Sequence, residues 1–71
     1  MKIDFELKKR IGVLSNRDGY TKELNLVEWD SKYLKYDVRL WMSDGKPGKG
    51  ITLTKAEAKE LRRLLNEEDL G

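Results

Sequence analysis

The side chains that usually perform enzyme chemistry are scarce in this chain. It contains no histidine and no cysteine among 71 residues, so its serines have no usual activating base and the common zinc-ligand sets are excluded. Asp37 with Glu23 or Glu28 could in principle supply a carboxylate pair for acid–base work. Expected on neighbouring strands, these carboxylates more simply pair with lysine or arginine across a sheet. We therefore predict a protein that is not an enzyme and that has no catalytic residues, metal or other cofactor.

Aromatic and basic side chains carry the more informative chemistry. Exposed aromatic rings stack with unpaired bases, at roughly 1–3 kcal/mol per base, and neighbouring cations neutralise phosphates. Such a surface favours single strands, because the bases of a duplex are already stacked. The predicted nucleic-acid-binding residues are Lys9, Lys22, Trp29, Tyr33, Lys35, Arg39, Trp41, Lys46 and Lys49. The pattern fits equally well a second interpretation, in which Trp29 and Trp41 belong to the core or to a dimer interface.

A long alternating strand must position several of these side chains. Over residues 33–42 the even positions are apolar from Tyr36 onward, and successive strand side chains point to opposite faces. The apolar face would hold Tyr36, Val38, Leu40 and Met42, and the other face Lys35, Asp37, Arg39 and Trp41. The second set predicts a surface for something flat and anionic.

Three more strands and one helix complete the expected order of elements. Alternation predicts strands over 3–14, 20–29 and 50–53, with turns at 16–19 and 30–32 and a Gly/Pro-rich break over 45–50. Lys9 occupies an apolar position of the first strand, which indicates a bulge or kink, or a point where the sheet face opens to solvent. Thr54 and Glu57 form a capping box ahead of a leucine stripe, which predicts a helix to about residue 66. Together these elements predict one α+β domain spanning 1–71.

Size and charge constrain the assembly. A chain of 71 residues buries little apolar surface and usually needs further stabilisation from disulfides, a structural metal or oligomerisation. Without cysteine or a zinc site, oligomerisation remains, so we expect a homodimer with Leu61, Leu64 and Leu65 at its interface. Residues 1–53 carry a net charge of +3 and residues 54–71 a net charge of −1. The positive excess of the strand region is compatible with a polyanionic partner but does not by itself indicate one.

The N-terminal segment and the apolar runs bear on location. Charged residues interrupt the first ten positions, which excludes the apolar centre of a signal peptide, and no run reaches membrane-spanning length. We expect a cytoplasmic protein that does not act at membranes or on a small-molecule substrate.

Two segments resemble a known family. They are Lys35–Tyr36–Asp37–Val38–Arg39–Leu40–Trp41 and Gly48–Lys49–Gly50–Ile51–Thr52–Leu53–Thr54, supported upstream by residues 12–15 and 21–27. The chain resembles the positive cofactor four family of transcriptional coactivators, most closely its bacterial YdbC-type branch. The resemblance implies a curved four-stranded antiparallel sheet with one C-terminal helix, dimerised through the helices.

The same resemblance implies a function. Single-stranded DNA would lie across the sheet with little sequence preference, contacting Arg39, Trp41 and Lys49, and by branch-level similarity Lys22, Trp29 and Lys35. Here one residue separates Arg39 from Trp41, whereas eukaryotic members have two, and the chain lacks their serine-rich tail. Coactivation of transcription is therefore not expected, whereas handling of strands exposed in transcription, replication or repair is.

Two other functions stay open on the residues alone. The same stacking surface could bind single-stranded RNA, which differs by its 2′-hydroxyls. Alternatively, the aromatic face could dock a protein partner.

Overall fold

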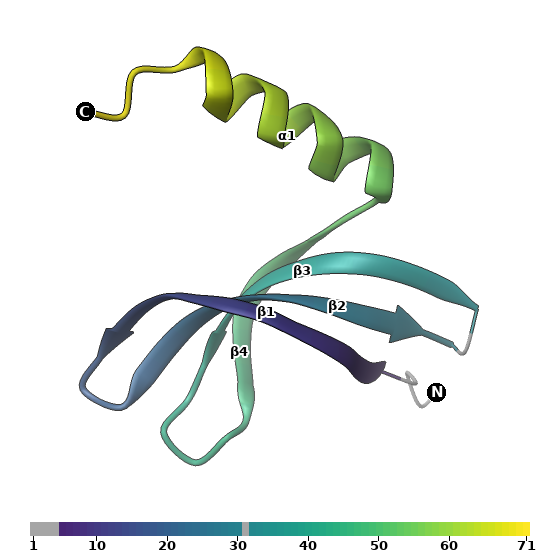
Figure 1. Ribbon diagram of the computed structural model, residues 1–71. Helices are drawn as coiled ribbons and strands as arrows, with labels where there is room; N and C mark the ends of the chain where they lie inside the picture. Colours follow the sequence, from purple (N-terminus) through teal and green to yellow (C-terminus); the bar gives the residue numbers. More distant parts are fainter. Residues whose placement is uncertain (1–4, 31) are drawn as a thin grey trace.

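Four strands and one helix follow one another along the chain (Figure 1). The computed structural model describes residues 5–30 and 32–71. Its elements are β1 (Phe5–Arg17), β2 (Tyr20–Trp29), β3 (Tyr33–Trp41), β4 (Pro47–Leu53) and α1 (Lys55–Glu67). Each strand pairs antiparallel with the next in one four-stranded sheet of order β1-β2-β3-β4. The predicted α+β class, with an antiparallel sheet followed by one helix, is confirmed.

The hairpin turns explain where the strands end. Asp18 and Gly19 have φ angles of 52° and 83°, a left-handed pair that suits a tight hairpin. The turn is therefore shorter than predicted, and β1 continues to Arg17 instead of ending at residue 14. The predicted start of β1 at residue 3 lies outside the described residues.

The beginning of β4 corrects a second prediction. The strand starts at Pro47, which pairs with Trp41, and not at residue 50. A Cβ atom on Gly50 would lie 2.5 Å from the Val38 carbonyl oxygen, so the glycine allows close approach between two strands. Gly50 thus serves a close contact between strands and not a turn. The predicted Gly/Pro-rich break over 45–50 is therefore wrong for residues 47–50, which belong to β4.

Strand β1 is the irregular edge of the sheet. Its pairing with β2 shifts register between Leu7 and Lys9 and at two later points. The first shift confirms the bulge or kink predicted at Lys9. Bulges bend a strand and increase its twist, and β1 arches across the sheet accordingly (Figure 1).

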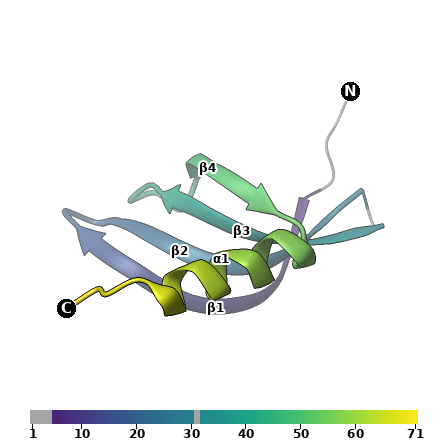
Figure 2. The same cartoon turned by 90° about the horizontal axis from the view of Figure 1, so that it is seen from above.

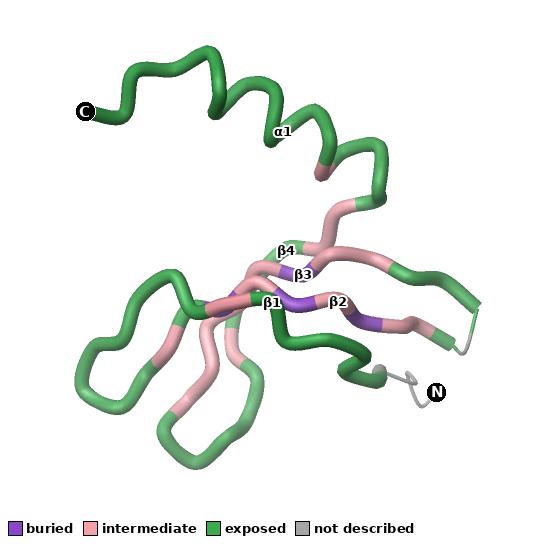
Figure 3. The backbone as a smooth tube through the Cα atoms, in the orientation of Figure 1, coloured by how far each residue is buried: buried purple, intermediate pink, exposed green. Residues whose placement is uncertain are grey.

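The helix lies over one face of the sheet, and from above it runs across the strands (Figure 2). It contacts β3 and β4, yet none of its residues is buried (Figure 3). Among the residues whose burial is described, Val27 is the only buried hydrophobic side chain, whereas Glu23, Asn25 and Asp37 are buried polar ones. The apolar core of one chain is therefore small.

The start of α1 matches the predicted capping box. The Thr54 N–H donates to Glu57 Oε1 at 2.8 Å, and the Glu57 N–H donates to Thr54 Oγ1 at 3.1 Å. The backbone and side-chain hydrogen bonds of Thr54, helped by the charge of Lys35, hold the pKa of Glu57 below its usual value. Among the residues that the structure describes, no helix has the length and apolarity that crossing a membrane requires.

Candidate nucleic-acid interface

The face of the sheet that points away from α1, here called the open face, is defined by cross-strand pairs. Residues directly opposite one another in a ladder share a face. From one end of β2 to the other, the pairs on the open face are Trp29–Tyr33, Val27–Lys35, Asn25–Asp37, Glu23–Arg39 and Thr21–Trp41. No register shift interrupts this ladder, so both tryptophans share one face with Lys35 and Arg39. The predicted alternation of β3 is confirmed.

Asp37 and Arg39 form an ion pair in the middle of the open face. Asp37 is fully buried, and the Arg39 side chain is only 18% exposed. Arg39 Nε donates to Asp37 Oδ2 at 3.0 Å, and Nη2 donates to Oδ1 at 2.9 Å. Its Nη1 donates to the Gly48 carbonyl oxygen at 2.8 Å. Three of the five guanidinium N–H donors therefore form hydrogen bonds within the protein itself.

Glu23 forms the centre of a second polar group. It is 5% exposed, and it accepts from Thr21 Oγ1 at 2.7 Å and from Asn25 Nδ2 at 3.3 Å. Arg10 Nε lies 3.3 Å from Glu23 Oε1. The Thr21 hydrogen bond, together with Asn25 and Arg10, outweighs burial and lowers the pKa of Glu23.

Arg10 is a cation of the open face that the sequence did not predict. It pairs with Asn25, and its side chain is 64% exposed. Alternation along β1 sets Arg10 on the face opposite Lys9, but only the pairing with Asn25 across the sheet shows that Arg10 reaches the open face and Glu23.

The aromatic residues lie towards the ends of the open face. Tyr33 is 57% exposed, whereas Trp29 and Trp41 are half-buried. The Trp41 indole nitrogen is buried without a hydrogen-bond partner among the described residues, so the nitrogen edge of that ring faces inward. The two tryptophans are separated by the length of β2, about 26 Å for an extended strand.

The remaining predicted cations are not all beside these rings. Lys9 pairs with Leu26 and Lys22 with Leu40, which places both on the helix side of the sheet. This agrees with the apolar position predicted for Lys9 and corrects the expected position of Lys22 beside the polar face. Lys46 and Lys49 are exposed in the β3–β4 hairpin: Lys46 lies in the turn beyond Trp41, and Lys49 lies in β4 opposite Leu40. The structure thus brings five of the nine predicted residues to the open face: Trp29, Tyr33, Lys35, Arg39 and Trp41.

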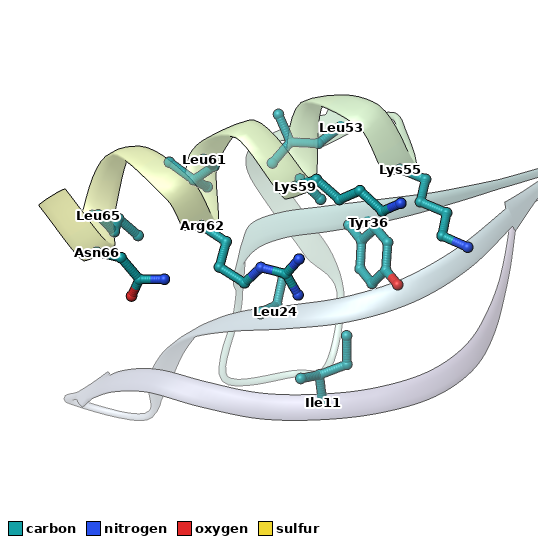
Figure 4. Close-up of a pocket in the computed structure, with 11 residues that line it drawn as sticks. Ile11, Leu24, Tyr36, Leu53, Lys55, Lys59, Leu61, Arg62, Leu65 and Asn66 are labelled. Atoms are coloured by element: carbon teal, nitrogen blue, oxygen red, sulfur yellow. The ribbon is translucent and has the colours of Figure 1, made fainter.

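A groove of about 570 Å³ runs between α1 and the sheet (Figure 4). Its apolar lining consists of Ile11, Leu24, Tyr36, Leu53, Ala58, Leu61 and Leu65. Lys55, Lys59 and Arg62 project from the helix along the same groove (Figure 4). Leu61 and Leu65 are 41% and 47% exposed, and Leu64, which is 50% exposed, lies outside the lining. Two of the three predicted interface leucines therefore line an open apolar groove.

The geometry defines a class: a single bent antiparallel sheet, with a polar open face on one side and a loosely covered apolar face on the other. No family model matches the chain. It is 43% identical over 68 residues to an uncharacterized protein of Treponema pallidum (strain Nichols), an alignment covering 93% of this chain and 80% of that protein. The chain belongs to the same family as this protein.

The open face combines ion pairs with aromatic rings. Within residues 5–30 and 32–71, the structure holds no cluster of three or more His, Cys, Asp or Glu side chains that could ligate a metal ion. The polar groups of the open face are instead carboxylate–arginine pairs flanked by aromatic rings. Such a face can stack with planar groups and attract anions, provided that its cations outweigh its carboxylates.

Proposed function

We propose that the protein is a homodimer that binds single-stranded DNA with little sequence preference, as a member of the positive cofactor four-like family in its YdbC-type branch. One observation carries this proposal: the open face bears an aromatic group near each end, with cations beside them. Binding requires no catalysis, and the proposed role is the handling of strands exposed in transcription, replication or repair in the cytoplasm.

The charges of the open face support an anionic ligand. Glu23 and Asp37 are each matched by an arginine within 3.3 Å, Arg10 and Arg39 respectively. Because these pairs cancel, three further lysines determine the sign of the surface. Half-buried Lys35 lies two residues from Tyr33 on β3, exposed Lys46 lies in the turn beyond Trp41, and exposed Lys49 lies in β4 opposite Leu40. Phosphates could therefore find cations near both aromatic ends.

Tyr33 is the best stacking platform of the face. It is 57% exposed and pairs with Trp29 across the ladder, so two rings lie together at this end. Stacking on such rings tolerates any base, because every base has a π-face. Sequence-tolerant binding follows from this mode of contact.

The groove supports the homodimer. One chain leaves the apolar groove open, and its buried hydrophobic core among the described residues is Val27 alone. Lys55 and Lys59 of the first half of α1 lie along the groove, whereas Glu67 ends the helix and Glu68 and Asp69 follow it. Two helices packed antiparallel across a two-fold axis would bring these opposite charges together.

A titration with an oligothymidine strand, followed by tryptophan fluorescence at two salt concentrations, tests the proposal. We expect saturable binding that weakens steeply with salt, because phosphate contacts release counterions. Tyr33→Ala should lower affinity by about 5–150-fold, the equivalent of roughly 1–3 kcal/mol of stacking. Tyr20→Ala is the matched control, because Tyr20 is 42% exposed but lies at the β1–β2 end on the helix side.

Several outcomes would overturn the proposal. A flat fluorescence signal at low salt, equal binding of duplex, or equal losses for the two tyrosine variants would each do so. Competition with the matched oligouridine strand separates DNA from RNA, because preference for the uridine strand would make the ligand RNA. Binding to a protein partner that salt does not affect would instead favour a protein-interaction module.

A further inference from the structure

We infer that Arg39 is a positioning residue: together with Asp37 it holds the β3–β4 hairpin, and it affects DNA binding through Lys46 and Lys49 instead of by its own phosphate contact. The DNA part of this inference rests on the proposed function. The resemblance to coactivators assigns Arg39 a direct DNA contact, so the two roles predict different behaviour.

The ladder is interrupted where Arg39 makes its third hydrogen bond. Arg39 pairs with Gly50 and Trp41 pairs with Pro47, so Gly48 and Lys49 together face Leu40. An extra residue in one strand leaves backbone groups without their ladder partners. Arg39 Nη1 supplies a donor to the Gly48 carbonyl oxygen at 2.8 Å, which fixes the bulged segment.

The anchor of this contact is rigid. Asp37 is fully buried and grips the guanidinium with both carboxylate oxygens, at 2.9 and 3.0 Å. Such a two-point pair fixes the plane of the guanidinium as well as its position. The fork then directs Nη1 at the Gly48 carbonyl, so β3 and the hairpin are tied through one side chain.

The hairpin itself has few other fixed points. The Met42 N–H donates to the Lys46 carbonyl at 2.8 Å, and the Gly45 N–H donates to the Met42 carbonyl at 2.9 Å. A Cβ atom on Gly48 would lie 2.8 Å from Met42 Cε, so this segment packs closely. The Lys46 side chain is 81% exposed, with its ammonium 4.0 Å from Asp44 Oδ2, and the Lys46 N–H donates to Asp44 Oδ1 at 3.0 Å. Both contacts are local to the turn, so the position of the turn relative to β3 also depends on the backbone that Arg39 holds.

Arg39→Lys distinguishes the two roles, because it keeps the charge but removes the fork. A lysine ammonium cannot hold both carboxylate oxygens and the Gly48 carbonyl in the same geometry. If Arg39 positions the hairpin, the slope of log affinity against log salt should become shallower by about 1.4, since each phosphate contact to a single strand contributes about 0.7 and two lysines are displaced. If Arg39 touches phosphate directly, the slope stays at its original value.

Two further variants make the comparison sharp. Asp37→Asn removes a negative charge, so a direct phosphate contact by Arg39 would be strengthened, whereas a positioning role predicts weaker binding. Arg17→Lys is the control, because it makes the same exchange at an arginine that pairs with Tyr20 on the helix side of the sheet. It should leave the salt slope unchanged.

Amide hydrogen exchange without DNA gives an independent measurement. In Arg39→Lys, exchange of the Met42 and Gly45 amides should accelerate relative to the Lys32 amide, which bonds to the Trp29 carbonyl at 3.0 Å in the other turn. Unchanged exchange at Met42 and Gly45 would show that Arg39 does not hold the β3–β4 hairpin, whatever the DNA result. An unchanged salt slope in Arg39→Lys, or tighter binding by Asp37→Asn, would overturn the positioning role. If the unaltered protein binds no strand at all, the proposed function fails and the DNA role of Arg39 fails with it. The exchange measurement would still decide whether Arg39 holds the β3–β4 hairpin.

Discussion

Leu65→Ala in α1 should weaken the proposed dimer by a predictable amount. Leu65 lines the groove and is 47% exposed in one chain. Full burial of a leucine is worth about 1.5–3 kcal/mol, so covering the remaining half contributes about 0.7–1.4 kcal/mol. A two-fold interface contains the residue twice, and the truncation should therefore cost about 1.4–2.8 kcal/mol of dimer free energy, or roughly 10–100-fold in the dissociation constant.

Sedimentation equilibrium over a range of protein concentrations measures this constant directly. Leu70→Ala is the matched control, because Leu70 follows the helix, is 75% exposed and lies outside the groove lining. Its dissociation constant should match that of the unaltered protein. The reasoning is refuted if the unaltered protein is a monomer at every concentration, or if the two alanine variants dissociate equally.

The remaining predictions concern the helix cap, acid stability and the length of the DNA strand. Thr54→Ala should cost about 1 kcal/mol in chemical denaturation, because it removes the hydroxyl that accepts from the Glu57 N–H. Folding lowers the pKa of both Glu23 and Glu57 below 4.5, so their stabilisation is complete above that pH and is lost as the pH falls through the folded-state values. Thermal unfolding between pH 6 and pH 3, taken as about 1.5 units either side of that value, should show this loss, and Glu23→Gln should flatten it. A strand long enough to reach from Tyr33 to Trp41 spans about 26 Å, or roughly eight stacked nucleotides at 3.4 Å each, so oligothymidines much shorter than this should bind markedly less tightly in the fluorescence titration.

Local patterns were sufficient to predict the elements that depend on local chemistry. The bounds of β2, the two faces of β3 and the start of α1 agree with the structure. In each case the signal is short-range: alternation along an uninterrupted ladder, or a hydroxyl and a carboxylate three residues apart. Dimerisation and DNA binding remain predictions, because neither is a property of one chain's backbone.

Residues in bulged or bent regions could not be placed in the same way. Alternation assigns Leu7, Lys9 and Val13 to one face. The register shifts in β1 instead place Leu7 and Val13 opposite Val27 and Glu23 on the open face, and Lys9 opposite Leu26 on the helix side. Similarly, alternation marks Glu23, Asn25 and Asp37 as solvent-facing, yet all three are buried. Neighbouring strands and side chains cover the middle of an arched sheet face, and no single-strand pattern contains that information.

The exposure of Arg39 was overestimated for a related reason. Asp37 stands two positions before it, so both side chains point to the same face of β3. The spacing made an ion pair foreseeable, but not the third hydrogen bond to Gly48, which requires the bulge in β4. Contacts across a bulge depend on register, and register depends on the whole sheet.

The buried Asp37–Arg39 pair is better explained by the shape of the open face than by stability. Removing two charges from water costs about as much as their attraction returns, and well-packed apolar residues often replace such pairs without loss. An apolar pair here, however, could not hold the Gly48 carbonyl, and it would place hydrophobic surface between the rings of an exposed sheet face. A sheet with apolar groups on both faces would tend to associate through either one. Ion pairs on the open face and an apolar groove beside α1 would direct the proposed ligand binding and the proposed self-association to opposite sides of one sheet.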